Sequence, residues 1–237
     1  MLVAAAVCPC PPLLVPEVAA GAAPELDAAR AACTDALGVL AASRPDRLVV
    51  VGPADSAGPE VYPQGARGSF RGFGVDVEVY LGADSGGVDG AELPHGLAVG
   101  AWLLGRTGWT DAPVDAIGVG DGLSAERCAA VGRDVAARAG RTALLVLGDA
   151  SACRTLKAPG YLDERAAPFD AEVGRALETA DPAALAALDA ELARELKASG
   201  RAPWQVLAGA AADSDLGGSL LYEDAPYGVG YIVATWS

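Results

Sequence analysis

A small set of thiol, imidazole and carboxylate side chains could carry out chemistry in this sequence of 237 residues. Its single histidine is His95. Cys8 and Cys10 lie two residues apart, so on an extended segment their side chains would point the same way. Thiolate, imidazole and carboxylate groups are ligands for Zn(II) and, where thiolates dominate, for Cu(I). One hypothesis is therefore a soft metal site that includes Cys153 or Asp149, or a thiol pair between Cys10 and Cys153.

Each of these residues also has a structural interpretation. Free cysteine behaves as a small apolar residue and is among the most often buried types. Asp149 follows an apolar run, where an aspartate can cap the next turn through its own backbone. His95 lies near a predicted helix start, where it can be a neutral, hydrogen-bonded side chain. The run at 118–122 (GVGDG) lacks the Gly-Lys-Ser/Thr ending of a phosphate loop, so it is a weak nucleotide signal.

Four short segments together resemble those of the class III extradiol dioxygenases, the LigB-like proteins, and of the related Memo-type proteins. They are residues 8–14 (CPCPPLL), 50–55 (VVGPAD), 93–97 (LPHGL) and 148–153 (GDASAC), and their order and spacing match as well. The chain also ends on a Gly-Val-Gly-Tyr segment that is similar to the family's last strand. The resemblance extends over nearly the whole chain.

The resemblance implies an iron site whose ligands are missing here. The family binds one ferrous ion through two histidines and a glutamate, which leaves positions open for a catechol and O2. The first histidine position is occupied by Cys10 and the second by Ala54. The family's acid–base histidine follows a serine that corresponds to Ser151, and the next residue is Ala152. The glutamate position falls near residues 200–203, where we find Arg201 and no acidic residue.

The resemblance therefore predicts a non-catalytic LigB-like protein with a degenerate active-site cleft and no cofactor, which binds a small molecule or a protein partner. His95 corresponds to the family's substrate-binding histidine. One alternative is a metal-dependent enzyme of the extradiol type that holds Fe(II) or Zn with Cys, His and Asp ligands, drawn from Cys8, Cys10, His95, Asp149 and Cys153. Another is a structural subunit of a larger enzyme. The predicted pocket residues are Cys10, Pro12, Ala54, Asp55, His95, Asp149, Ser151, Ala152, Cys153 and Tyr161.

Apolar runs and helical patterns alternate along the chain, which predicts one α/β domain over residues 1–237 with a mostly parallel or mixed sheet flanked by helices. Strands are predicted at 2–7, 47–51, 75–80, 114–119, 142–147, 219–222 and 228–235, and helices at 24–42, 93–105, 124–138, 182–199 and 205–212. Residues 58–74 read as a loop and 84–90 as a turn. Because open α/β sheets place ligands at the carboxyl ends of their strands, Cys10, Ala54, His95 and Ser151 should converge on one cleft.

Composition excludes some partners. The formal net charge is −14, which disfavours nucleic acids and anionic membranes. No apolar run is long enough to span a bilayer, and the first residues lack the basic segment of a signal peptide. Five cysteines at irregular spacing do not form a disulfide framework, which predicts a cytoplasmic protein. Homo-oligomerisation stays open.

Overall fold

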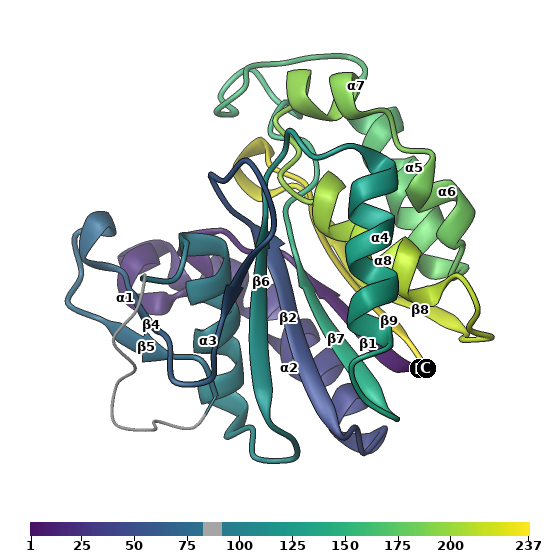
Figure 1. Ribbon diagram of the computed structural model, residues 1–237. Coiled ribbons are helices and arrows are strands. Elements are labelled where there is room, and N and C mark those ends of the chain that lie inside the picture. The colour runs from purple at the N-terminus through teal and green to yellow at the C-terminus, as the bar shows by residue number, and fades with distance from the viewer. Residues whose placement is uncertain (83–91) are drawn as a thin grey trace.

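The computed structural model describes residues 1–82 and 92–237, so the predicted turn at 84–90 lies outside the described residues. Seven strands form one sheet in the order β3-β6-β2-β7-β1-β9-β8 (Figure 1). Their bounds are β1 Leu2–Cys8, β2 Arg47–Pro53, β3 Glu60–Tyr62, β6 Val114–Val119, β7 Thr142–Leu147, β8 Gly218–Asp224 and β9 Tyr231–Trp236. The neighbours β6, β2, β7 and β1 pair in parallel, whereas β3, β9 and β8 are antiparallel to their neighbours. The predicted mixed α/β fold is confirmed.

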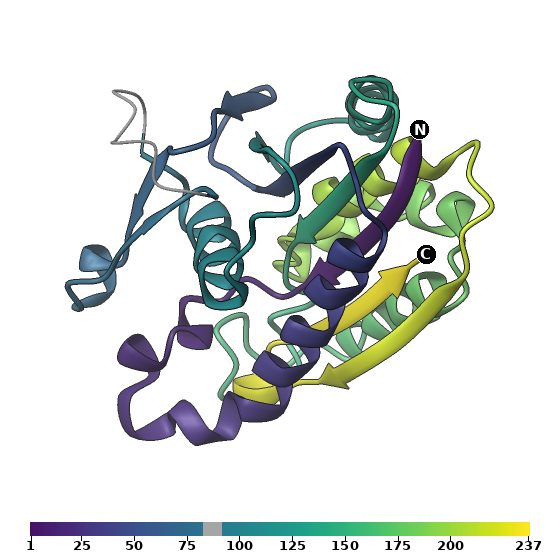
Figure 2. The ribbon, with the colours of Figure 1, turned by 90° about the horizontal axis from the view of Figure 1, so that it is seen from below.

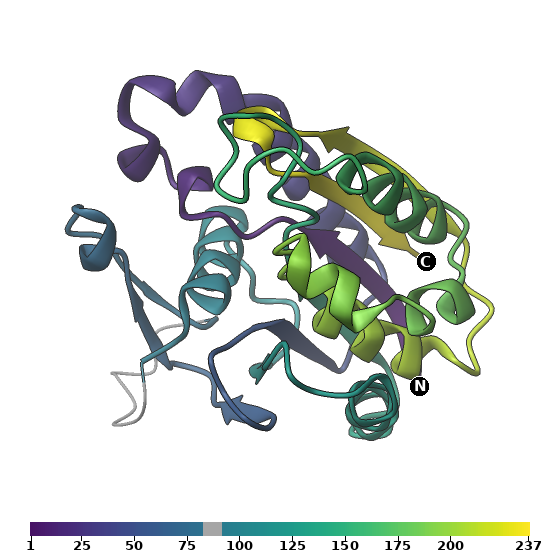
Figure 3. The same ribbon diagram turned by 90° about the horizontal axis from the view of Figure 1, so that it is seen from above.

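Helices cover both faces of this sheet, which is why its central strands are continuous apolar runs rather than alternating ones. Helices α2 (Asp27–Ala42) and α3 (His95–Thr107) pack on one face. Helices α4 (Ala125–Ala136), α5 (Ala166–Glu178) and α8 (Arg201–Ala211) pack on the other (Figures 2 and 3). All six residues of β7 are buried, as expected for a strand between two helical layers.

Shorter elements connect these layers. A separate two-stranded sheet pairs β4 (Arg67–Ser69) with β5 (Glu78–Tyr80). The short helices are η1 Pro12–Leu14, α1 Pro16–Ala19, η2 Ala20–Leu26, η3 Arg71–Phe73, α6 Pro182–Ala186, α7 Ala190–Glu195 and η4 Pro226–Gly228. No helix among the described residues is both long and apolar enough to cross a membrane.

The structure differs from the sequence-based prediction in several places. The predicted loop at 58–74 contains β3 and β4, and the predicted strand at 75–80 shortens to β5. The helix predicted from residue 24 begins at Asp27, after a 3-10 turn that contains Pro24. The helix predicted at 205–212 begins at Arg201, and α5 was not predicted.

The prediction of a single helix at 182–199 is wrong, because this segment forms two separate helices, α6 and α7. Asp189 caps a new helix, since its side chain accepts hydrogen bonds from the backbone N–H groups of Glu191 and Leu192. Lys197 then takes a left-handed backbone conformation with φ of 57°, which ends α7. This break turns the chain toward the carboxyl ends of the parallel strands.

Candidate functional site

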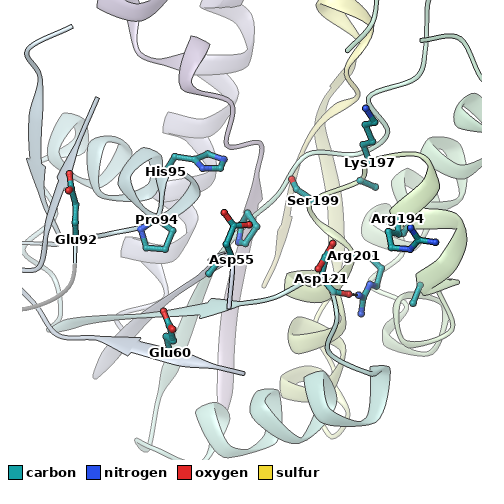
Figure 4. Close-up of a pocket in the computed structure, with 15 residues that line it drawn as sticks. Asp55, Glu60, Glu92, Pro94, His95, Asp121, Arg194, Lys197, Ser199 and Arg201 are labelled. Carbon is teal, nitrogen blue, oxygen red and sulfur yellow. Dashed lines mark hydrogen bonds between the residues drawn. The ribbon is translucent and has the colours of Figure 1, made fainter. Parts of the chain in front are cut away.

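A cavity of about 620 Å³ lies at the carboxyl ends of β2 and β6 (Figure 4). This volume is within the range of small-molecule sites, roughly 300 to 1,000 Å³. Two separate parts of the chain supply its walls, one from residues 53–121 and one from residues 190–201. The lining residues are Pro53, Ala54, Asp55, Glu60, Glu92, Pro94, His95, Asp121, Ala190, Ala193, Arg194, Lys197, Ala198, Ser199 and Arg201.

The acidic wall, which we define as Asp55, Glu60 and Glu92, lies beside His95 (Figure 4). His95 is the first residue of α3 and is exposed, with its ring edge-on to that of Phe73 at a centroid distance of 6.2 Å. The carboxyl groups come from the loop after β2, from β3 and from the segment before α3. All three side chains are exposed.

Close packing fixes the position of His95. A Cβ atom added to Gly96 would lie 2.9 Å from Cγ of Pro53 and 3.4 Å from Sγ of Cys10. Because only glycine fits there, the first turn of α3 can press directly against the end of β2. The approach holds His95 at the mouth of the cavity.

The basic wall, which we define as Arg194, Lys197 and Arg201, faces the acidic wall (Figure 4). The Arg201 guanidinium is buried and donates to the carbonyl oxygens of Asp121 and Leu123. These hydrogen bonds hold the guanidinium group in place and join α8 to the loop after β6. Lys197 is exposed, and its Nζ makes one long contact of 3.5 Å with the carbonyl oxygen of Pro159.

A polar cluster made of Cys10, Asp149 and Ser199 lies behind the cavity lining. Asp149 Oδ1 accepts from the backbone N–H of Cys10 at 2.8 Å, and its own N–H donates to Ser199 Oγ at 2.9 Å. Burial raises the pKa of Asp149 to about 7, against the opposing effect of the Cys10 hydrogen bond. Burial and the charge of Asp149 raise the pKa of the Cys10 thiol well above its usual range. At neutral pH this cluster holds a thiol and a carboxyl that is part protonated.

The structure brings together only some of the predicted site residues. Ala54, Asp55 and His95 line the cavity, and Cys10 and Asp149 lie behind it. The cavity lining leaves out the remaining five, which are Pro12, Ser151, Ala152, Cys153 and Tyr161. Pro12 begins η1, and Tyr161 is 62% exposed on a loop with a left-handed backbone. Of the four residues predicted to converge, Ala54 and His95 line this cavity, Cys10 lies behind it, and Ser151 is not among its lining residues.

Ser151 faces the helical layer instead. Its hydroxyl donates to Asp170 of α5 at 2.9 Å, and its backbone N–H donates to the same carboxylate at 2.8 Å. Arg154 also donates to Asp170, so this buried carboxylate is fully engaged in structure. Ser151 is therefore fully buried against α5, a helix that was not predicted, and does not line this cavity. Its neighbour Ala152 is buried as well.

The predicted thiol pair between Cys10 and Cys153 is also wrong. Cys10 belongs to the core on the α2 and α3 face, whereas Cys153 belongs to the core on the α4, α5 and α8 face. Cys8 does share the face of Cys10, and its thiol hydrogen-bonds to Cys33 of α2, which together with burial raises the pKa of Cys8. All five cysteines are free and buried.

No cluster of metal ligands forms within residues 1–82 and 92–237. Nowhere in these ranges do three His, Cys, Asp or Glu side chains gather closely enough to hold an ion. The set Cys8, Cys10, His95 and Cys153 is therefore not brought together. Sequence reasoning also missed most of the polar lining of the cavity, which is Glu60, Glu92, Asp121, Arg194, Lys197 and Ser199. Only Asp121 carried a usable signal, because it follows the predicted strand at 114–119.

The comparisons with known proteins give a fold and no family. The sequence matches no known protein-family model and no curated protein. The structure is similar to the crystal structure of an uncharacterized protein from Escherichia coli K12, with a TM-score of 0.57 and 14% sequence identity over 99% of each chain. At this identity the likeness supports a shared fold along the whole chain.

Proposed function

We propose that this protein is a non-catalytic, LigB-like protein that binds a small polar molecule in the cavity at the carboxyl ends of β2 and β6. The observation that carries the proposal is the cavity itself, about 620 Å³ in volume and lined by charged groups of both signs. Its place at the carboxyl ends of parallel strands is the usual ligand position in open α/β sheets. Small-molecule sites combine such a concave surface with a few well-placed polar groups.

The residues at the family's iron positions support binding without ring cleavage. A two-histidine, one-carboxylate site needs two imidazoles, and the chain has one histidine. Cys10 is a buried thiol whose pKa burial raises well above its usual range, so its loss of a proton to become a metal ligand is more costly than for an exposed thiol. Arg201 brings a fixed positive charge to the cavity wall, which opposes a divalent cation.

Metal analysis tests the absence of the family's chemistry. We expect the purified protein to contain no stoichiometric iron and to consume no O2 when catechols are added. About one iron per chain, together with a ring-cleaved product, would contradict the proposal and favour the metal-dependent alternative.

Thermal unfolding with a library of small polar compounds tests the binding function. A ligand that binds only the folded protein stabilises it by about 2.7 kcal/mol at a hundredfold excess over Kd. Ala190 is exposed and lines the cavity, whereas Ala187 is exposed and lies outside its lining. We expect Ala190→Trp to abolish the thermal shift of any hit and Ala187→Trp to preserve it. Hits that both variants retain would show that binding occurs elsewhere.

A further inference from the structure

We infer that the ligand of this cleft is a small zwitterion, with its ammonium group on the acidic wall and its carboxylate at Lys197. This inference rests on the proposed binding function and adds the chemical class of the ligand. Free amino acids and short peptides share this chemistry, and a cavity of about 620 Å³ has room for either.

The acidic wall forms no close ion pair with a protein cation in the part of the chain that the structure describes, although Glu92 is near enough to Arg71 to help raise the pKa of that guanidinium. None of the ion pairs within 4.0 Å among the described residues involves Asp55, Glu60 or Glu92. Glu60 accepts a hydrogen bond from the Tyr62 hydroxyl at 2.7 Å, which leaves its charge unpaired. The sequence at 83–91 contains no Lys, Arg or His. This wall therefore attracts a cationic group.

The basic wall has one cation to offer. Arg194 pairs with Glu191, and Arg201 is held by the carbonyl oxygens of Asp121 and Leu123. Lys197 has no carboxylate partner among the described residues and only the long contact with Pro159. The left-handed backbone of Lys197 fixes where its side chain leaves the end of α7, and Figure 4 shows it across the cavity from His95.

Other ligand classes fit these walls less well. A purely anionic molecule would face the unpaired carboxylates, and a purely cationic one would leave Lys197 without a counter-charge. A bare metal ion lacks a site, because no three ligating side chains gather within residues 1–82 and 92–237. A zwitterion forms favourable contacts with both walls. The charges of the walls then also set its orientation, with the ammonium toward Asp55.

Isothermal titration with matched probes tests the inference. The zwitterionic probes are the proteinogenic L-amino acids and glycyl dipeptides, each titrated singly. Every probe that binds is compared with its amine, which lacks the carboxylate, and with its N-acetyl form, which lacks the ammonium charge. We expect both analogues to bind at least about tenfold more weakly, which corresponds to about 1.4 kcal/mol.

Two charge-removing variants assign the two ends. Lys197→Met should lower the affinity of the zwitterion about tenfold, to that of its amine, since one tenfold step is about 1.4 kcal/mol. Asp55→Asn should lower it toward that of the N-acetyl form. The matched controls are Lys157→Met and Asp213→Asn, which alter exposed residues outside the cavity lining and should leave the affinity unchanged.

The outcomes separate this inference from the proposed function. Equal binding of a zwitterion and its two analogues, or unchanged affinity in Lys197→Met, overturns the zwitterion and leaves a small-molecule site. Binding confined to compounds with a single charge or none has the same meaning. If no probe of any class binds at millimolar concentration, the inference and the proposed function both fail.

Discussion

At the scale of single residues, Asp149 couples the candidate site to pH. Its side chain is half-buried, and burial raises the pKa of its carboxyl to about 7. An aspartate in an unfolded chain titrates near 3.9, so the folded protein holds this proton more tightly over roughly pH 4 to 7. Stability must then fall as the pH rises through this window, since the folded state there binds more protons than the unfolded state.

We predict that Asp149→Asn removes this loss. The amide oxygen of asparagine can still accept from the Cys10 N–H, and an amide does not ionise. Between about pH 5 and pH 8, the free energy of unfolding of the wild type should fall relative to the variant by at least about 1.4 kcal/mol, the equivalent of one pKa unit. Urea denaturation at both pH values measures the difference. Parallel pH dependences in the two proteins would show that Asp149 ionises normally.

The cysteines should be unreactive in the folded protein. All five are buried, and burial raises the pKa of Cys10, Cys128 and Cys153. Because the thiolate is the nucleophile, we expect Ellman's reagent at pH 8 to label native thiols slowly and all five rapidly in guanidinium chloride. Rapid labelling of one native thiol would reveal a reactive cysteine and revive a redox role.

At the scale of elements, the position of the basic wall depends on the contact between α4 and α8. A Cβ atom on Gly209 would lie 2.2 Å from the carbonyl oxygen of Ala129, and one on Gly132 would lie 2.0 Å from that of Val206. The two helices therefore touch backbone to backbone. Since α8 begins with Arg201, this contact also sets where that wall stands.

Two alanine substitutions test this contact. We predict that Gly209→Ala destabilises the protein by about 1 to 3 kcal/mol or more, as expected for overpacking against rigid backbone. The matched control is Gly38→Ala, because Gly38 is exposed within α2 and an added Cβ meets no atom within 4 Å. That change should stabilise by about 0.5 to 1 kcal/mol through helix propensity. Similar effects of both substitutions would exclude the close helix contact.

Long apolar runs in the sequence were enough to predict the central strands. The prediction failed where an apolar pattern and a helix-capping side chain favour different structures. The strands near 2–7, 47–51, 114–119 and 142–147 are confirmed. The helix predicted from residue 124 is confirmed as α4, and the Ser124 hydroxyl caps it by accepting from the N–H of Arg127. In contrast, the leucine stripe from Leu185 to Leu196 suits one helix, but the Asp189 side chain favours a new start. Periodicity alone could not rank these two effects.

The same limit applies to the candidate site. The resemblance pointed to Ala54 and His95, and the rule that ligands bind at strand ends predicted that both share one cleft; both line the cavity. The opposite wall comes from α7 and α8, about 140 residues later in the chain than Ala54. Only tertiary packing brings Lys197 to the cavity, so no local pattern could indicate it. The same packing directs Ser151 toward Asp170 and away from the cavity.

At the scale of the whole molecule, a ferrous site of the family's type needs ligands from three distant segments to meet at one point. Cys10 follows β1 and Ala54 follows β2, and β7 lies between these two strands in the sheet. The resemblance assigns the third position to the start of α8, where the carbonyl oxygens of Asp121 and Leu123 accept hydrogen bonds from Arg201 and keep it in place. The proposed scaffold thus presents a fixed cation where iron needs a carboxylate.

We therefore predict that Cys10→His combined with Ala54→His restores neither tight iron binding nor ring cleavage. Two imidazoles return, but the positive charge of Arg201 opposes Fe(II). The resemblance also assigns the acid–base histidine to position 152, which is Ala152 here, and loss of such a group commonly costs about 10² to 10⁴ in rate. Anaerobic calorimetric titration with Fe(II), followed by oxygen uptake with catechols, measures both steps. Tight binding with rapid turnover would contradict the prediction.

A third substitution shows which carboxylate is responsible if iron binds. Asp149 is the acidic residue that contacts Cys10 directly, so it is the first candidate for a ligand beside a histidine at that position. Adding Asp149→Asn to the double variant should then abolish iron binding, whereas Asp213→Asn, outside the cavity lining, should not. If neither addition matters, the ion lies away from the strand ends, and the two restored histidines do not mark the family's site.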